Sequence, residues 1–127
     1  MNSLQNYERK GKMNYRIVPT DYFETQAKTL SKKYRSFPDD LEDFKKELLK
    51  KPLMGDDLGG NFRKVRMAIA SKNKGKRGGA RVITLNLLID AENAKIFLLT
   101  IYDKGKQEII SKEEIKRLKT ITGLIQN

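Results

Sequence analysis

The spacing of apolar residues changes several times along the chain, and each change predicts a different element. A short apolar run at Asn14–Pro19 ends at its proline and predicts an edge strand. Helical spacing begins at Asp21, which forms a plausible capping pair with Glu24. A second helix is predicted from a cap at Ser36, with proline in its first turn, to Lys50. Because the link between them is short, we expect the two helices to form an antiparallel hairpin.

The second half of the chain has the period of β-strands. Leu53–Gly60 is expected to be a glycine-bearing loop, and the alternation that follows predicts a strand over Phe62–Ala70. Ser71–Gly79 is rich in lysine and glycine and is expected to be a turn. Two apolar, β-branched runs, Ala80–Ile89 and Lys95–Tyr102, then predict a hairpin buried in the sheet.

The order of these elements predicts an α+β fold. It runs strand, two helices, three-strand meander and a last helix, which the capping box at Ser111–Glu114 opens. The helical hairpin is expected to pack on a small, mainly antiparallel sheet. Residues 1–12 are polar and without period, so we expect a flexible leader before a single domain at 13–127.

Composition narrows the chemistry that the chain can perform. It has neither cysteine nor histidine, which excludes a disulfide, a thiol nucleophile, a zinc finger and a Ser-His-Asp triad. No apolar run approaches the roughly 20 residues of a membrane span, and the first twelve residues lack the apolar core of a signal peptide. We therefore expect a cytoplasmic protein without a membrane partner. Its net charge of +11 indicates a polyanionic partner.

The positive charge is concentrated in one part of the sequence. Between Leu58 and Ile89 there is no acidic residue, whereas seven acids lie in the preceding stretch from Asp39 to Asp57. Such segregation favours a phosphate-binding strip over a basic face kept only for solubility. The cations of this strip are Arg63, Lys64, Arg66, Lys72, Lys74, Lys76, Arg77 and Arg81.

Several strings of the sequence resemble one family. FRKVRMAIASKNKGKRGGARVITLNLL, followed by IFLLTIYDKG and preceded by PLMGDDLGG, closely resembles the RelE/HigB toxins of bacterial type II toxin–antitoxin modules, within the RelE/ParE superfamily. The resemblance covers residues 13 to about 120. It implies the RelE-like order β-α-α-β-β-β-(α) and a toxin that cleaves messenger RNA in the ribosomal A site and is silenced by an antitoxin.

The resemblance also implies a mechanism and a set of site residues. Cleavage in this family is metal-independent and needs no cofactor, because the RNA 2′-hydroxyl attacks its own phosphate and expels the 5′-oxygen. The family's basic pair falls on Lys64 and Arg66, and its arginine after the Gly-Gly turn falls on Arg81. Its basic residue past the last strand falls on Lys104. Its tyrosine would fall near Ile110 and is absent, so the candidate replacement is Tyr102.

The residues themselves agree with this chemistry. Lys64 and Arg66 are two apart on a predicted strand and therefore project from the same face, with Lys64 the candidate general base. Arg81 opens an apolar strand, and its planar guanidinium suits the oxygens of a phosphate. The lysine-rich turn is suited to ribosomal RNA. The expected RNA- and ribosome-binding residues are Arg63, Lys72, Lys74, Lys76 and Arg77.

Three functions remain open from the sequence. The first is a ribosome-dependent mRNA endonuclease that an acidic antitoxin neutralises by covering the basic strip. The second is a ParE-type toxin that uses the same fold to poison DNA gyrase; it is less favoured because it does not need the converging cations Lys64, Arg66 and Arg81. The third is a non-catalytic RNA-binding module, which the missing tyrosine keeps open. Fold alone does not distinguish these functions.

Overall fold

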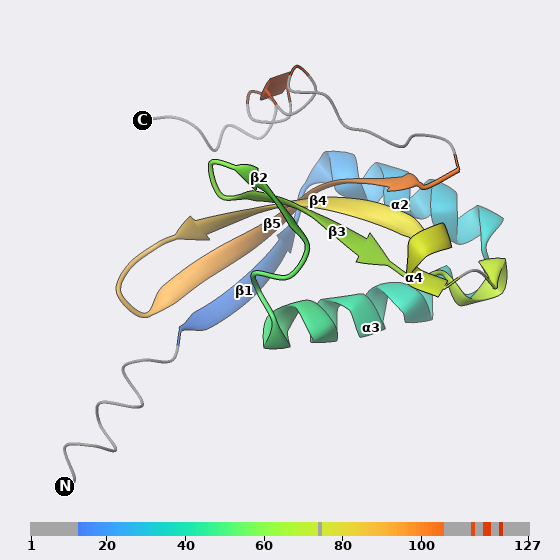
Figure 1. The fold of residues 1–127 in the computed structure, drawn as a ribbon, viewed down its shortest axis with the longest axis horizontal. Coiled ribbons are helices and arrows are strands. Elements are labelled where there is room, and N and C mark those ends of the chain that lie inside the picture. The colour runs from blue at the N-terminus through green and yellow to red at the C-terminus, as the bar shows by residue number, and fades with distance from the viewer. Residues whose placement is uncertain (1–12, 74, 106–112, 114–115, 118–119, 121–127) are drawn as a thin grey trace, which may run out of the picture.

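The computed structural model describes residues 13–73, 75–105, 113, 116, 117 and 120. It has the expected α+β class, with helices packed on a five-stranded, mostly antiparallel sheet (Figure 1). The elements in chain order are β1 (Asn14–Pro19), α2 (Asp21–Lys33), α3 (Phe37–Lys50), β2 (Asp56–Gly59), β3 (Phe62–Met67), η1 (Ala70–Lys72), α4 (Gly75–Gly78), β4 (Ala80–Leu88) and β5 (Asn93–Asp103).

The strands lie in the order β1-β5-β4-β3-β2. β1 is at one edge, as its terminal proline predicts, and pairs in parallel with β5, whereas the other neighbours are antiparallel. β5 extends beyond the end of β1, and α2 covers the edge that this leaves. There the side-chain oxygen of Gln26 accepts hydrogen bonds from the Ile101 N–H at 3.1 Å and the Thr100 hydroxyl at 2.5 Å.

The expectation of a simple loop over residues 53–60 is wrong. Four of these residues form the strand β2, which pairs with the start of β3 and adds a fifth strand. Aspartate and glycine are poor strand formers, so the sequence contains no local signal for it. β2 forms because the tight turn at Gly59, Gly60 and Asn61, all with positive φ, folds it back onto β3.

Both long helices begin differently from what the sequence predicts. The N-cap of α2 is Thr20, whose hydroxyl accepts the Phe23 N–H at 3.2 Å, so Asp21 is the first helical residue and not the cap. Ser36 occupies the N-cap position of α3, but its side chain makes no capping bond. Its hydroxyl instead donates to Asp40 Oδ2 at 2.6 Å.

The two helices share one core against one face of the sheet. Phe23 and Leu30 of α2 and Phe44 and Leu48 of α3 lie in the same buried cluster as strand residues such as Val82. The helical spacing of the apolar residues therefore predicts the buried faces of both helices correctly. Apart from an irregularity in the β4–β5 pairing next to Ile83 and Thr84, alternate residues along the strands point to the opposite face, where the candidate site lies.

The predicted turn at residues 71–79 is more structured than expected. It contains the 3₁₀ turn η1 and the helical turn α4. Gly79 ends it because there is no room for a side chain: a Cβ there would lie 2.1 Å from the Met67 carbonyl oxygen. The close approach of this residue to the chain after β3 closes the turn onto the sheet.

Three of the sequence predictions lie wholly or largely outside the described residues. They are the leader at 1–12, the side chain of Lys74 and the last helix that begins near Ser111. No helix in the described part of the chain is long and apolar enough to cross a membrane.

The close approach at Gly79 gives a test of the fold. We expect Gly79→Ala to lower the free energy of unfolding by about 3 kcal/mol, because the clash is with main-chain atoms that cannot rotate away. Gly75→Ala is the matched control. Gly75 has φ +63° and open space around it, so its cost is only the backbone strain, about 1 kcal/mol. Urea unfolding measures both; equal losses would contradict this account.

Candidate functional site

Three predicted site residues lie in one row across the middle of the sheet. Arg66 of β3 pairs in register with Arg81 of β4, which pairs in register with Tyr102 of β5. Directly paired residues point to the same face, so all three side chains lie on the face opposite α2 and α3. Lys64, two residues before Arg66, belongs to the same face. We call Lys64, Arg66, Arg81 and Tyr102 the cross-strand cluster.

The cross-strand cluster borders an apolar patch on the same face. Residues of three neighbouring strands form this patch, and Tyr102 itself is part of it. The apolar surroundings lower the local dielectric, so charges at this border act more strongly than in water. The buried members of the patch are Phe62, Ile83, Leu85, Phe97, Leu99 and Tyr102.

Arg81 is buried, and its guanidinium is largely occupied by main-chain oxygens. Its relative exposure is 6%. Nη1 donates to the carbonyl oxygens of Lys76 at 3.2 Å and Ala80 at 3.1 Å, and Nη2 donates to that of Arg77 at 3.1 Å. Burial lowers the pKa of Arg81 and the charge of Arg66 lowers it further. Arg81 thus holds the α4 turn against β4, and only part of its fork is left for a ligand.

Tyr102 contributes a hydroxyl that has no partner among the residues that the structure describes. The side chain is 8% exposed, and its Oη is buried with no hydrogen bond within the described part of the chain. Burial raises the pKa of Tyr102, against the opposing effect of the Arg81 charge. Burying a hydroxyl without a hydrogen bond is unfavourable for folding. A ligand that accepts or donates a hydrogen bond at the Tyr102 hydroxyl would therefore bind favourably.

Several predicted RNA-binding cations are instead used to hold the fold together. Arg63 donates to the carbonyl oxygens of Met54 at 3.1 Å and Gly55 at 2.9 Å, and so fastens the loop before β2. Lys76 forms an ion pair with Glu47 of α3 at 2.7 Å. Both side chains are therefore already bound to carbonyl or carboxylate oxygens of the protein.

Four other predicted cations have no side-chain hydrogen bond or ion pair within the described residues: Lys64, Arg66, Arg77 and Lys104. Arg66 and Arg77 are exposed, whereas Lys64 and Lys104 are half-buried. The main chain of Lys104 pairs with Gly79, since its N–H donates to that carbonyl oxygen at 3.0 Å. These four cations are the ones that the structure leaves available for an anionic ligand.

A buried carboxylate that the sequence analysis missed, Asp103, ties the basic turn to the end of β5. It is 7% exposed and accepts hydrogen bonds from the Tyr34 hydroxyl at 2.5 Å, the Lys72 ammonium at 2.6 Å and the Gly105 N–H at 3.2 Å. Burial alone would raise the pKa of Asp103, but the bonds from Lys72, Tyr34 and Gly105 outweigh it and hold that pKa well below the ordinary value.

The Asp103 network changes the role of Lys72. This lysine was predicted to bind RNA, yet it is 13% exposed and paired with the carboxylate. A second set of bonds anchors the same turn to α3: the Ser36 hydroxyl accepts the Ser71 N–H at 2.8 Å, and Asp40 accepts the Ala70 N–H at 2.9 Å. The turn is therefore docked at both ends, in contrast to an open hairpin loop.

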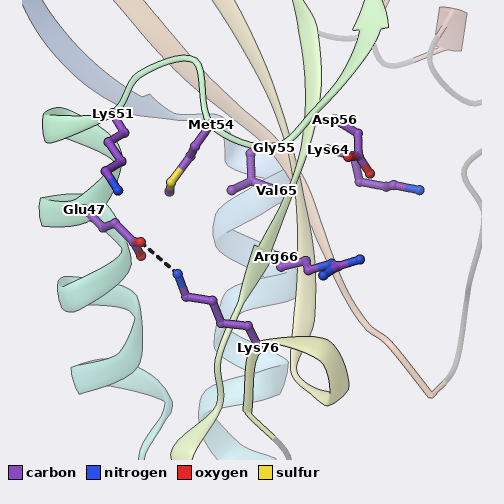
Figure 2. Close-up of a pocket in the computed structure, with 9 residues that line it drawn as sticks. All are labelled: Glu47, Lys51, Met54, Gly55, Asp56, Lys64, Val65, Arg66 and Lys76. Carbon is purple, nitrogen blue, oxygen red and sulfur yellow. Dashed lines mark hydrogen bonds and ion pairs between the residues drawn. The ribbon is translucent and has the colours of Figure 1, made fainter.

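A pocket of about 410 Å³ lies between α3 and β3, and Figure 2 shows how its lining residues point. Val65 faces α3, whereas Lys64 and Arg66 extend from the opposite side of the strand. Lys64 and Arg66 are among the residues that line the pocket, but in Figure 2 their side chains extend away from those of Lys51 and Met54. Arg81 and Tyr102 do not line it, so the pocket holds only part of the cross-strand cluster, and the cluster remains the candidate site.

Asp56 is the second acid that the sequence analysis did not anticipate. β2 pairs it in register with Lys64, and in Figure 2 the two side chains extend to the same side of the sheet. The acid-free stretch of sequence is therefore not an acid-free surface. No group of three or more carboxylates suited to a metal ion occurs among the described residues.

The hydrogen bonds of Arg81 predict that its removal affects stability as well as activity. We expect Arg81→Ala to lower the free energy of unfolding by about 2–3 kcal/mol, because three carbonyl contacts are lost in a buried position. Arg66→Ala, from the exposed partner in the same row, should change it by less than about 0.5 kcal/mol. Thermal and urea unfolding of both variants measure the difference, and similar losses would show that these bonds do not stabilise the fold.

The low pKa of Asp103 predicts a pH-dependent contribution to stability. Asp103→Asn should cost about 2 kcal/mol at pH 7, since it breaks a largely buried ion pair. The cost should shrink as the pH falls below about 4, because the unfolded carboxyl then takes up a proton with its ordinary pKa while the folded one stays ionised. Urea unfolding between pH 7 and pH 3 tests this, with Asp43→Asn on the exposed side of α3 as the control. A cost that is independent of pH would contradict it.

Comparison with known families is consistent with this fold. The family model described as the RelE toxin of the RelE / RelB toxin-antitoxin system matches residues 15–127. This match spans all the described elements from β1 to β5 except the first residue of β1. The chain therefore belongs to the RelE toxin family, whose members are paired with an antitoxin.

Proposed function

We propose that this toxin is a ribosome-dependent endonuclease that cleaves messenger RNA in the A site. Messenger RNA cleavage of this kind is the general activity of the family. The observation that carries the proposal is the cross-strand cluster, in which Lys64 and Arg66 have no side-chain partner among the described residues and lie beside the buried pair Arg81 and Tyr102. Converging cations next to an apolar patch suit a phosphate that gains charge in the transition state.

The proposed reaction is an internal transesterification without metal or cofactor. The 2′-hydroxyl loses its proton to a base and attacks the adjacent phosphorus, and the 5′-oxygen leaves with a proton from an acid. Lys64 is the sequence-based candidate for the base. Arg66 and Lys104 supply positive charge for the phosphate, and Tyr102 is the candidate acid because its hydroxyl has no partner within the described residues.

The remaining cations support binding to the ribosome in different ways. Arg77 is exposed and without a partner among the described residues, so it is suited to direct contact with ribosomal RNA. Arg63, Lys72 and Lys76 are held by the protein's own oxygen atoms, and Lys76 extends to the α3 side of β3, so their contribution is to the net positive charge of the molecule. The face with the cross-strand cluster is the proposed target of an acidic segment of the antitoxin, which would block access to Lys64 and Arg66.

The cross-strand cluster also favours the nuclease over a gyrase poison on the same fold. Binding to gyrase requires a complementary surface but no cations gathered around one phosphate. Here the sheet brings two arginines and a lysine from β3 and β4 onto one face, next to a tyrosine hydroxyl. This arrangement supports phosphoryl chemistry more than it supports a surface that only binds gyrase.

Primer extension on a message translated in a purified system tests the proposal. We expect breaks inside codons that require both the toxin and ribosomes. Lys64→Ala and Arg66→Ala should each reduce the cleavage rate by about 10²–10⁴-fold, because they remove charge or proton transfer at the phosphate. Lys28→Ala, which removes an exposed lysine from α2, is the matched control and should cleave at the wild-type rate.

The outcomes separate the three candidate functions. Intact message with arrested translation would contradict the nuclease and favour a non-catalytic RNA-binding module. Intact message with normal translation would point to gyrase, and a supercoiling assay would then test that function. Cleavage that Lys64→Ala and Arg66→Ala leave unchanged would retain the nuclease but place its site elsewhere on the molecule.

A further inference from the structure

We propose that Asp56 is a further catalytic residue and acts as the general base for the RNA 2′-hydroxyl. The inference rests on the proposed function, since it assigns a step of that reaction. Its structural basis is the position of Asp56 on β2, directly opposite Lys64 on β3. Together they place a proton acceptor and a cation side by side at the border of the cross-strand cluster.

The geometry at this position is specific to Asp56. In Figure 2, the side chains of Asp56, Lys64 and Arg66 extend to the same side of β3. Asp57, the next residue of β2, pairs with Arg63 instead, and its Oδ1 accepts the N–H of Gly59 at 2.8 Å. The alternation of the strand thus separates two adjacent carboxylates: one caps its own turn and the other joins the cluster.

The carboxylate of Asp56 is free to accept a proton. It makes no side-chain hydrogen bond or ion pair of 4 Å or less within the described residues. The charged and titratable groups on the same face of the neighbouring strands are Lys64 and Arg66 of β3, Arg81 of β4 and, three strands away, Tyr102 of β5. From α3 and the turn before β4, Glu47, Lys51 and Lys76 line the same pocket as Asp56. Its negative charge reaches as far as the Arg81 guanidinium, whose pKa it raises slightly against the larger lowering effect of burial. Asp56 therefore belongs electrostatically to the cross-strand cluster.

If a carboxylate is the base, Lys64 does not have to accept the proton and can keep its positive charge for the phosphate. Asp56 takes the proton of the 2′-hydroxyl, the 2′-oxygen bonds to phosphorus, and the bond from phosphorus to the 5′-oxygen breaks. The 5′-oxygen takes a proton from the acid, for which Tyr102 is the candidate. The products are a 2′,3′-cyclic phosphate and a 5′-hydroxyl, and the protonated Asp56 returns its proton to restore the acid. Lys64 stays an ammonium ion throughout and stabilises the charge on the phosphate.

The test compares Asp56→Asn with Asp57→Asn under single-turnover conditions on ribosomes. Both changes remove one negative charge from the same short strand without changing its length. We expect Asp56→Asn to cleave at least about 100-fold more slowly and to lose the acid limb of the pH–rate profile. Its affinity for ribosomes should be unchanged or higher, since a negative charge has left a cationic surface. Asp57→Asn should cleave like the wild type, and Asp56→Glu should recover part of the activity.

A message with sulfur in place of the 5′-oxygen at the cleaved bond separates a base from an acid. A thiolate leaves without a proton, so a variant that lacks the acid, such as Tyr102→Phe, should regain speed on this message. Asp56→Asn should remain slow, because the 2′-hydroxyl still needs its base. Recovery of Asp56→Asn would overturn the assignment, as would wild-type cleavage of the normal message by Asp56→Asn. If the wild-type protein cleaves no message at all, the proposed nuclease itself fails, and the role of Asp56 fails with it.

Discussion

The register of β3, β4 and β5 is the constraint on which the candidate site depends. Side chains alternate between the two faces of a strand, so a slip of one residue would move Arg66 or Tyr102 to the helix-covered face. Buried residues next to the cluster resist such a slip. Val65, beside Arg66, and Val82, beside Arg81, would leave the core at the same time. The packing of α2 and α3 on one face therefore determines which side chains meet on the other.

The structure divides the cations of the basic strip into two groups. Arg63, Lys72, Lys76 and Arg81 are bound to oxygen atoms of the protein and hold the loop before β2, the η1–α4 turn and the end of β5 in place. The four cations without such partners in the described part of the chain lie next to these supports: Lys64, Arg66, Arg77 and Lys104. The charges of the first group are partly neutralised by the protein's own oxygen atoms. In return, these bonds fix the loops and strand ends beside which the second group lies.

The sequence predicts the fold class, the two long helices and four of the five strands with their approximate bounds. It also predicts the edge position of β1, because apolar period and flanking prolines encode these features locally. It does not predict β2, since aspartate and glycine give no strand signal and the pairing with β3 is what forms it. For the same reason Asp56 is absent from the predicted site. Asp103 is missed because its partners Tyr34 and Lys72 are far away in sequence; a lone acid at the end of an apolar strand is the one signal that could have found it.

The most direct test of this account is a structure of the toxin on a ribosome with a messenger whose A-site 2′-hydroxyls are methylated to prevent cleavage. The account predicts that the scissile phosphate lies over the cross-strand cluster, in contact with Lys64 and Arg66 and on the face opposite α3. A phosphate bound instead on the α3 side of β3, beside Lys51 and Lys76 and away from the Lys64 and Arg66 side chains, would contradict it.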